Sequence, residues 1–351
     1  MPISPKTRKL LSGALRWSLA AGLTVALLWY LFSKVNFADM MRIISTGVDY
    51  SWILCAMGLS VVSHMIRARR WQLQLNALGI RPPYMALCCS IFGCYALNII
   101  FPRLGDLWRC TYIAKRQKAQ LTTVIGSMVS DRLADSFTVL LLFLLTLVLA
   151  RPAIDAFLER YPVGRDMLAL LASPWLWVAL AAALLLMAAA YHRWRGTRFV
   201  SRLRQWGLEL WQGFASVLNM RHRSAFILLS LLLWGCYYMQ LYVAFYAFPF
   251  TRELCATAGL GFGLLPCLVA FVLSSIAMGI PSNGGLGPWN IAIMFGLALY
   301  GVSEAQGTAF SMLQWSGQTV MLILLGLFTI AYILLSRRRT APAAAVRTSV
   351  R

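Results

Sequence analysis

The chain has 351 residues, of which 60% are hydrophobic and only 12% are charged, and its mean hydropathy is +0.70. Soluble domains carry about 25% charged residues, so this composition excludes an ordinary soluble protein and indicates a chain that crosses a membrane several times. The 32 Lys and Arg residues outnumber the 11 Asp and Glu residues, but they occupy short segments between apolar runs. That placement argues against nucleic acid as a partner and is typical of cytoplasmic loops beside anionic lipid.

The first apolar run, residues 13–33, follows the basic stretch KTRK at 6–9. It is long, and the LFSKVNF at its end lacks a small-x-small cleavage site, so we expect a retained span rather than a signal peptide. A helical span needs about 20 residues, which makes the run at 288–300 too short to cross alone and the run at 84–101 borderline. The remaining apolar runs lie at about 50–66, 121–150, 170–191, 224–247, 259–280 and 309–335.

The cations in the loops indicate how these runs cross. Strict alternation would place the basic segments 102–120 and 192–223 outside, against the positive-inside tendency. If 84–101 instead enters from the cytoplasm and returns, all strongly basic loops are cytoplasmic, and 259–300 then enters from the outside and returns there. We therefore predict an all-α polytopic membrane protein with about six full transmembrane helices plus two re-entrant, broken helical hairpins, about eight helical membrane elements in all.

The predicted elements also repeat. The order span, span, re-entrant hairpin, span occurs at 13–150 and again at 170–335, starting inside in the first half and outside in the second. Inverted-topology repeats with interrupted helices are a recurrent transporter design. We predict that residues 1–351 form one integral membrane domain made of these two half-repeats. Both termini, including the basic tail 336–351, are expected on the cytoplasmic side of a bacterial-type inner membrane.

Charged residues mark the break of the first hairpin. In the stretch 98–116, a proline and a glycine interrupt the helix, and Arg103, Asp106 and Arg109 lie at the interruption. Arg103 and Asp106 can pair with each other, which would leave Arg109 free to meet Asp131 or a lipid phosphate. The alternative is an ordinary basic loop that follows the positive-inside rule.

The span that follows begins with charged residues. About fifteen apolar residues come after Asp135, or roughly 22 Å of helix against roughly 30 Å of hydrocarbon. Asp131, Arg132 and Asp135 are therefore drawn toward the membrane interior, and Arg132 can reach Asp135 at i,i+3 while one carboxylate is left over. Either these residues face an interior site or they cap the helix at the cytoplasmic interface.

Two other stretches are typical of contact with the membrane surface. Arg67, Arg69, Arg70 and Trp71, in RARRW at the cytoplasmic end of the second span, predict an interfacial anchor. Residues 202–218 place apolar side chains at helical spacing, which predicts an amphipathic helix on the cytoplasmic leaflet.

The second hairpin turns at PSNGGLGPW, residues 281–289, which contains three glycines and two prolines. Irregular backbone at membrane depth is tolerated where it lines a cavity or is buried in protein. We expect Asn283, Gly284, Gly285 and Gly287 to line a cavity, with helix N-terminal N–H groups pointing at an anion such as phosphate. The alternative is a tight helix crossing built on small residues.

Taken together, RARRW, PRLGD with a following Arg, DRLAD at the head of a span and PSNGGLG resemble the flippase-like transmembrane family over about residues 10–336. Its best-known members form the membrane half of lysylphosphatidylglycerol synthase. Asp106 and Asp131 stand where the family commonly has Glu. Asn290 stands where the family often has an acid, and an amide cannot carry a proton-titrating role. Fused members carry a large soluble synthase domain. This chain ends in a short tail, and the resemblance implies the translocating or lipid-binding half alone.

We therefore predict a lipid flippase or transporter, not an enzyme, that holds an anionic lipid, either a phospholipid or a polyprenyl-phosphate-linked lipid, at two broken helices. The cysteines and histidines lack ligand spacing, so no metal and no cofactor is expected. The alternative is a non-catalytic subunit or scaffold for a separate lipid-modifying enzyme. The predicted binding residues are Arg103, Asp106, Arg109, Asp131, Arg132, Asp135, Asn283, Gly284, Gly285, Gly287 and Asn290.

Overall fold

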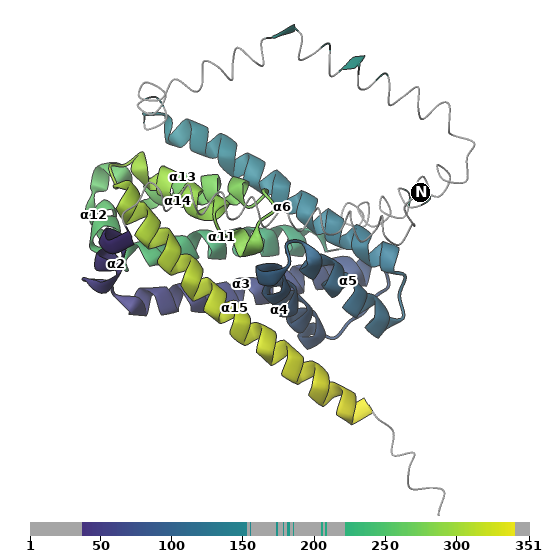
Figure 1. Cartoon of the computed structure of the whole chain (residues 1–351). Coiled ribbons are helices and arrows are strands. Elements are labelled where there is room, and N and C mark those ends of the chain that lie inside the picture. The colour runs from purple at the N-terminus through teal and green to yellow at the C-terminus, as the bar shows by residue number, and fades with distance from the viewer. Residues whose placement is uncertain are drawn as a thin grey trace, which may run out of the picture.

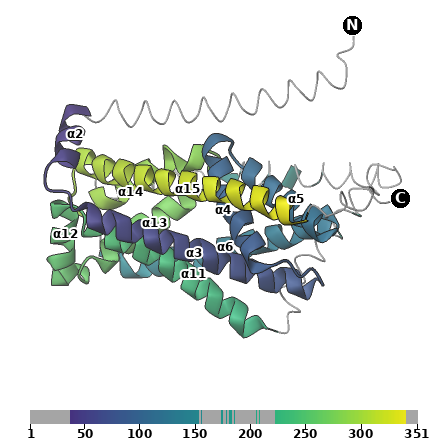
Figure 2. The ribbon, with the colours of Figure 1, turned by 90° about the horizontal axis from the view of Figure 1, so that it is seen from below.

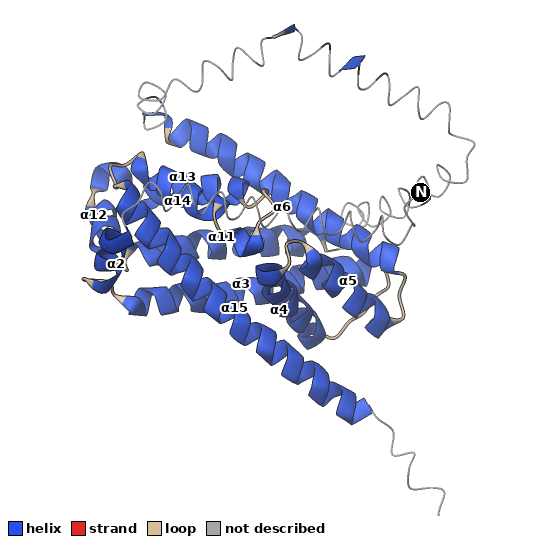
Figure 3. Cartoon of the chain, viewed as in Figure 1, coloured by secondary structure: helices blue, strands red, loops and turns tan. Residues whose placement is uncertain are grey.

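The structure is a computed structural model that describes residues 37–152 and 222–340, with a few isolated positions between them. Helices and short loops make up these two ranges, and no strand occurs in either (Figure 3). The spans predicted at 13–33 and 170–191, the amphipathic helix predicted at 202–218 and the tail beyond residue 340 lie outside the described residues.

The first half of the chain contributes α2 (Phe37–Ser45), α3 (Tyr50–Ala77), α4 (Tyr84–Ile100), α5 (Leu104–Gln117) and α6 (Leu121–Leu149). The second half contributes α11 (Arg223–Phe245), α12 (Pro249–Ala256), η1 (Ala258–Leu260), α13 (Leu264–Ala277), η2 (Asn283–Gly285), α14 (Pro288–Ala298) and α15 (Glu304–Thr340). Figure 1 shows α15 running diagonally across the bundle, and Figure 2 shows α3 and α11 side by side.

Five of the described segments are long and apolar enough to cross a membrane by length and composition. Four of them, α3, α6, α11 and α15, coincide with predicted full spans. The fifth, Ala258–Ala277, is the first arm of the hairpin predicted at 259–300. The all-helical membrane architecture is thus confirmed, while the number of full crossings and the re-entrant course of the hairpins stay predictions.

Helix α3 begins where an aspartate caps it. The Asp49 carboxylate accepts the backbone N–H of Ser51 at 3.1 Å, which satisfies one of the free donors of the first turn. The same hydrogen bond holds the pKa of Asp49 below its usual range.

The first hairpin was predicted within 84–101, but that range is the single helix α4, and the chain turns back only through α5. The two helices pack antiparallel. Gly93 of α4 lies against the Trp108 ring, and Gly105 of α5 lies so close to the Cys94 carbonyl that a side chain there would displace the backbone. Most of the segment 102–120, for which an ordinary basic loop was the alternative, is helix α5, and its cytoplasmic placement stays a prediction. Helix α5 is amphipathic, although its many charged residues make this hard to see in the sequence. Its buried face comprises Gly105, Asp106, Arg109, Cys110, Ile113 and Ala114.

The second hairpin is formed by α13 and α14, which also pack antiparallel. A Cβ atom on Gly296 of α14 would stand 2.7 Å from the Cα of Ala270 on α13, and one on Gly285 would stand 2.6 Å from the Met278 sulfur. Small residues thus set the close approach of the two arms.

We expect Gly296→Ala to lower the free energy of unfolding by about 1–3 kcal/mol, because the added methyl meets backbone that must shift. Gly235→Ala in α11 is the matched control, since a Cβ there meets nothing within 4 Å and alanine favours helix. Denaturant unfolding in mixed micelles measures both. Equal stability of the two variants would contradict the close packing of α13 and α14.

Several helices of each half of the chain pack against helices of the other half. Each half consists of a helix, a hairpin and a helix: α3, α4–α5 and α6 in the first, and α11, α13–α14 and α15 in the second. Helix α3 packs on α11, while α4 of the first half packs on α15 of the second and α13 of the second packs on α6 of the first. A two-fold relation between the halves would produce this pattern of contacts, and the inverted repeat itself stays a prediction.

Candidate functional site

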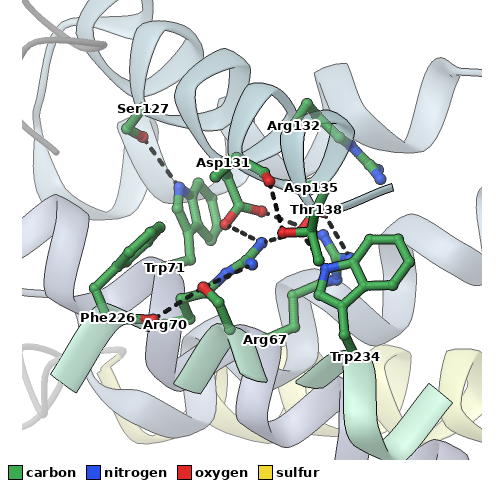
Figure 4. A network of polar contacts seen from close by, with 12 residues as sticks. Arg67, Arg70, Trp71, Ser127, Asp131, Arg132, Asp135, Thr138, Phe226 and Trp234 are labelled. Carbon is green, nitrogen blue, oxygen red and sulfur yellow. Dashed lines mark hydrogen bonds and ion pairs between the residues drawn. The ribbon is translucent and has the colours of Figure 1, made fainter. Parts of the chain in front are cut away.

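Two arginines of α3 and two aspartates of α6 form a closed ionic network (Figure 4). The Arg67 guanidinium lies 3.2 Å from Asp131 and 2.9 Å from Asp135, and the Arg70 guanidinium lies 2.6 Å and 2.7 Å from the same two carboxylates. All four residues are buried, with exposed fractions of 3%, 0%, 0% and 8% in the order Arg67, Arg70, Asp131, Asp135. We call these four residues the ionic quartet.

Helix α11 adds hydrogen bonds to the ionic quartet. Arg67 Nε donates to the Tyr237 hydroxyl at 3.1 Å, and Arg70 Nη1 donates to Ser230 Oγ at 3.3 Å. The indole N–H of Trp234 donates to Asp135 at 3.4 Å. Because buried charges need partners on every side, these contacts tie α3, α6 and α11 into one unit.

The ionic quartet corrects two predictions. The interfacial anchor expected at RARRW is wrong for Arg67, Arg70 and Trp71, which are buried, and only the neighbouring Arg69 is exposed as an anchor would be. The Arg132–Asp135 pair is also wrong, because Asp135 pairs with α3 while the Arg132 side chain points away from it (Figure 4). One sequence pattern could have indicated the ionic quartet: two arginines at i,i+3 lie on one helix face, and two aspartates at i,i+4 lie on one face of another helix.

A cavity of about 280 Å³ lies at the break of the first hairpin, between α5 and α6. Arg132 Nη2 donates to Asp106 Oδ1 at 2.8 Å, which joins the two helices at the cavity wall. The remaining lining combines one more guanidinium with apolar side chains. The lining residues are Arg103, Asp106, Leu107, Ile125, Met128 and Arg132.

Arg103 does not pair with Asp106 as expected. Its Nη2 instead donates to the carbonyl of Gly279, in the turn of the second hairpin, at 2.9 Å. The Arg103 backbone has φ +66°, a left-handed conformation that non-glycine residues adopt infrequently and that directs the chain into α5.

Arg109 does not reach Asp131 either. It is fully buried, its guanidinium carbon lies 4.8 Å from the centroid of the Trp71 ring, and its Nε lies 3.4 Å from Asp106 without a hydrogen bond. Its Nη2 also has no hydrogen-bond partner. The arginine predicted to be free is thus held by stacking and by one carboxylate.

The buried charges of the site balance, but the charges around the cavity do not. Among the described residues, the buried charged side chains are three arginines and three aspartates. Arg103 and Arg132 are additional and more exposed, and both line the cavity. The cavity wall therefore carries two guanidiniums against the single carboxylate of Asp106, and this excess of positive charge suits an anion.

The glycine-rich break satisfies part of its own backbone. Gly287 N–H donates to the Asn290 side chain at 3.1 Å, and Leu286 N–H donates to the Asn283 carbonyl at 3.1 Å. The expectation that amides around this break point freely at an anion is therefore wrong for these two groups. The Asn290 side chain accepts the Gly287 N–H because a side chain at the third helical position is well placed to cap the start of the helix.

The turns of the two hairpins contact each other. A Cβ atom on Gly284 would stand 3.5 Å from the Cα of Ile99 near the end of α4, and the Trp315 indole N–H donates to the Gly284 carbonyl at 2.9 Å. Together with the Arg103–Gly279 bond, these contacts hold the two breaks, 176 residues apart in sequence, at one place. The small-residue packing named as the alternative for PSNGGLG thus contributes to this arrangement.

The cavity lining and the ionic quartet together contain five of the predicted site residues: Arg103, Asp106, Asp131, Arg132 and Asp135. Arg109 contacts Asp106 from outside both sets, and Asn283, Gly284, Gly285, Gly287 and Asn290 belong to neither. Sequence reasoning missed Arg67 and Arg70. In the two described ranges, no group of three or more His, Cys, Asp or Glu side chains is placed to hold a metal ion.

Comparison with known proteins gives one family match. The model of the lysylphosphatidylglycerol synthase TM region matches residues 17–326. No curated protein and no solved structure matches the chain.

Proposed function

Because the chain belongs to the family of lysylphosphatidylglycerol synthase transmembrane regions, we propose that it moves an anionic lipid headgroup across the membrane, as a flippase or lipid transporter. The family and the apolar helices make it a multi-pass membrane protein of a lipid-related type. The proposal adds a bacterial-type inner membrane, cytoplasmic termini and a lipid that carries a phosphate.

The cavity between α5 and α6 carries this proposal. A phosphate there would accept hydrogen bonds from Arg132 and Arg103, and guanidinium groups bind phosphate with two parallel bonds. Asp106 orients Arg132 through its 2.8 Å bond. Leu107, Ile125 and Met128 offer apolar contacts to the part of the lipid next to its acyl chains.

The contact between the two hairpin turns supports transport in particular. Arg103 belongs to the cavity wall and also binds Gly279 in the other half of the chain. A phosphate that draws the Arg103 guanidinium into the cavity would break this bond and release one hairpin turn from the other. Binding would thereby be coupled to a rearrangement of the two halves, as in transporters built from repeats with broken helices.

The test is reconstitution of the purified chain into vesicles that contain a fluorescent lipid in both leaflets. We expect fluorescent phosphatidylglycerol to exchange between leaflets at least about tenfold faster than fluorescent phosphatidylcholine. The choline group of phosphatidylcholine is positively charged and is repelled by Arg103 and Arg132, whereas phosphatidylglycerol carries only a negative charge. Chemical bleaching of the outer leaflet measures both rates. If neither lipid moves but the chain binds a lipid-modifying enzyme, the scaffold function replaces this proposal.

A further inference from the structure

Two arginines lie beside one carboxylate at the break of the first hairpin. Asp106 Oδ1 accepts a hydrogen bond from Arg132 Nη2 at 2.8 Å and lies 3.4 Å from Arg109 Nε, outside hydrogen-bond geometry. The Cys94 thiol donates to the same oxygen at 3.6 Å. In the part of the chain that the structure describes, no group donates to the other oxygen, Oδ2. The Asp106 carboxylate therefore has one oxygen with three neighbours and a second oxygen that can still accept.

Arg109 offers a matching pair of unused donors. Its Nε and Nη2 lie on the same edge of the guanidinium, and neither has a hydrogen-bond partner although the side chain is fully buried. This edge can bind a carboxylate through two parallel bonds of about 2.7–2.9 Å. Rotation of the Asp106 carboxylate, with about half an ångström of approach, would form that pair.

The surroundings fix Arg109 and the backbone near Asp106, so the carboxylate is the part that can move. The Arg109 guanidinium stacks on Trp71 at 4.8 Å, and the Trp71 indole donates to Ser127 of α6 at 3.0 Å (Figure 4). Gly105, the residue before Asp106, packs so tightly on α4 that a Cβ atom there would overlap the α4 backbone. A change of partner at Asp106 thus requires only side-chain rotation.

We infer that an anion bound to Arg132 transfers the Asp106 carboxylate from Arg132 to Arg109, which makes Arg109 a positioning residue of the cavity. This inference rests on the proposed function. A phosphate on Arg132 takes the donor that Asp106 uses, and it repels the carboxylate because both carry negative charge. The free edge of Arg109 then supplies the partner that a buried carboxylate needs.

The transfer changes the charge that the cavity presents. At rest, Arg103 and Arg132 face the single carboxylate of Asp106, which leaves one net positive charge on the wall. After the transfer, Asp106 is paired with the buried Arg109, and both cavity guanidiniums are left to bind the anion. The empty cavity therefore avoids two unpaired cations inside the membrane, where unpaired charges are costly.

The experiment measures binding of dihexanoyl phosphatidylglycerol, a short-chain lipid, to the purified chain in mixed micelles by calorimetry. We expect Arg109→Gln, which leaves Asp106 paired with Arg132, to weaken binding about tenfold, because the displaced carboxylate then has no new partner. The double variant Arg109→Gln, Asp106→Asn should recover the wild-type affinity within about threefold, since no carboxylate has to be displaced. Arg116→Gln is the matched control, because it removes an exposed cation further along α5, and it should match wild type.

Infrared difference spectroscopy observes the carboxylate directly. The carboxylate stretching bands depend on hydrogen bonding, so addition of the lipid to wild-type protein should shift a band that Asp106→Asn lacks. This measurement leaves Arg109 unchanged and therefore tests the transfer even if Arg109→Gln does not fold.

A double variant that binds as weakly as Arg109→Gln overturns the transfer, because Arg109 would then act independently of Asp106. Wild-type affinity in Arg109→Gln, or lipid binding without a shift of the Asp106 band, overturns it as well. Each of these results leaves the proposed function in place. Wild-type protein that does not bind phosphatidylglycerol overturns the proposed function and the transfer with it.

Discussion

Replacing Arg70 by methionine is expected to lower the free energy of unfolding by about 3–5 kcal/mol, the largest stability effect that we predict. Arg70 is fully buried and binds both Asp131 and Asp135. Without it, two buried carboxylates share the single guanidinium of Arg67, and one negative charge is left without a partner. Denaturant unfolding of the purified protein in mixed micelles measures the loss.

Arg69→Met is the matched control, because Arg69 is the preceding residue of α3 and is exposed. Its effect should stay within about 1 kcal/mol. The double variant Arg70→Met, Asp131→Asn removes the surplus negative charge and should be more stable than Arg70→Met alone. If Arg69→Met and Arg70→Met destabilise equally, the ionic quartet does not hold α3 to α6.

Arg132→Ala is expected to slow exchange of fluorescent phosphatidylglycerol about 10–100-fold, the largest functional effect that we predict. A hydrogen bond to a charged group contributes about 1.5–3 kcal/mol, which corresponds to this range of rates. Stability should fall less than in Arg70→Met, because the Arg132 side chain is 36% exposed and the buried Asp106 keeps Arg109 as a neighbouring cation. The vesicle exchange rate and the unfolding free energy together separate binding from folding.

Two further variants test whether the geometry and the position of the Arg132 guanidinium matter for exchange. Arg132→Lys keeps the charge but loses the two-pronged geometry, so its rate should fall between those of wild type and Arg132→Ala. Lys115→Ala removes an exposed cation from α5 and should leave the rate unchanged. A normal exchange rate in Arg132→Ala would exclude the cavity as the place where the phosphate binds.

Composition and apolar run length determined the class of this protein. An all-helical, multi-pass chain follows from the 60% of hydrophobic residues and from runs long enough to span hydrocarbon. The two helix breaks were also predictable in position, because proline and glycine interrupt the helices at 102–105 and 281–288. These features are local, since helix formation and its interruption depend on neighbouring residues.

The pairing of charges was decided by the tertiary structure. Spacing in sequence placed Asp131 and Asp135 on one face of a helix and predicted pairs with near neighbours such as Arg132. The partners of Asp131 are instead Arg67 and Arg70, which belong to another helix and lie more than 60 residues earlier in the chain. Local spacing cannot indicate which helix packs against that face. A buried carboxylate binds whichever guanidinium the packing brings into the same dry interior, because water is absent there as the alternative partner.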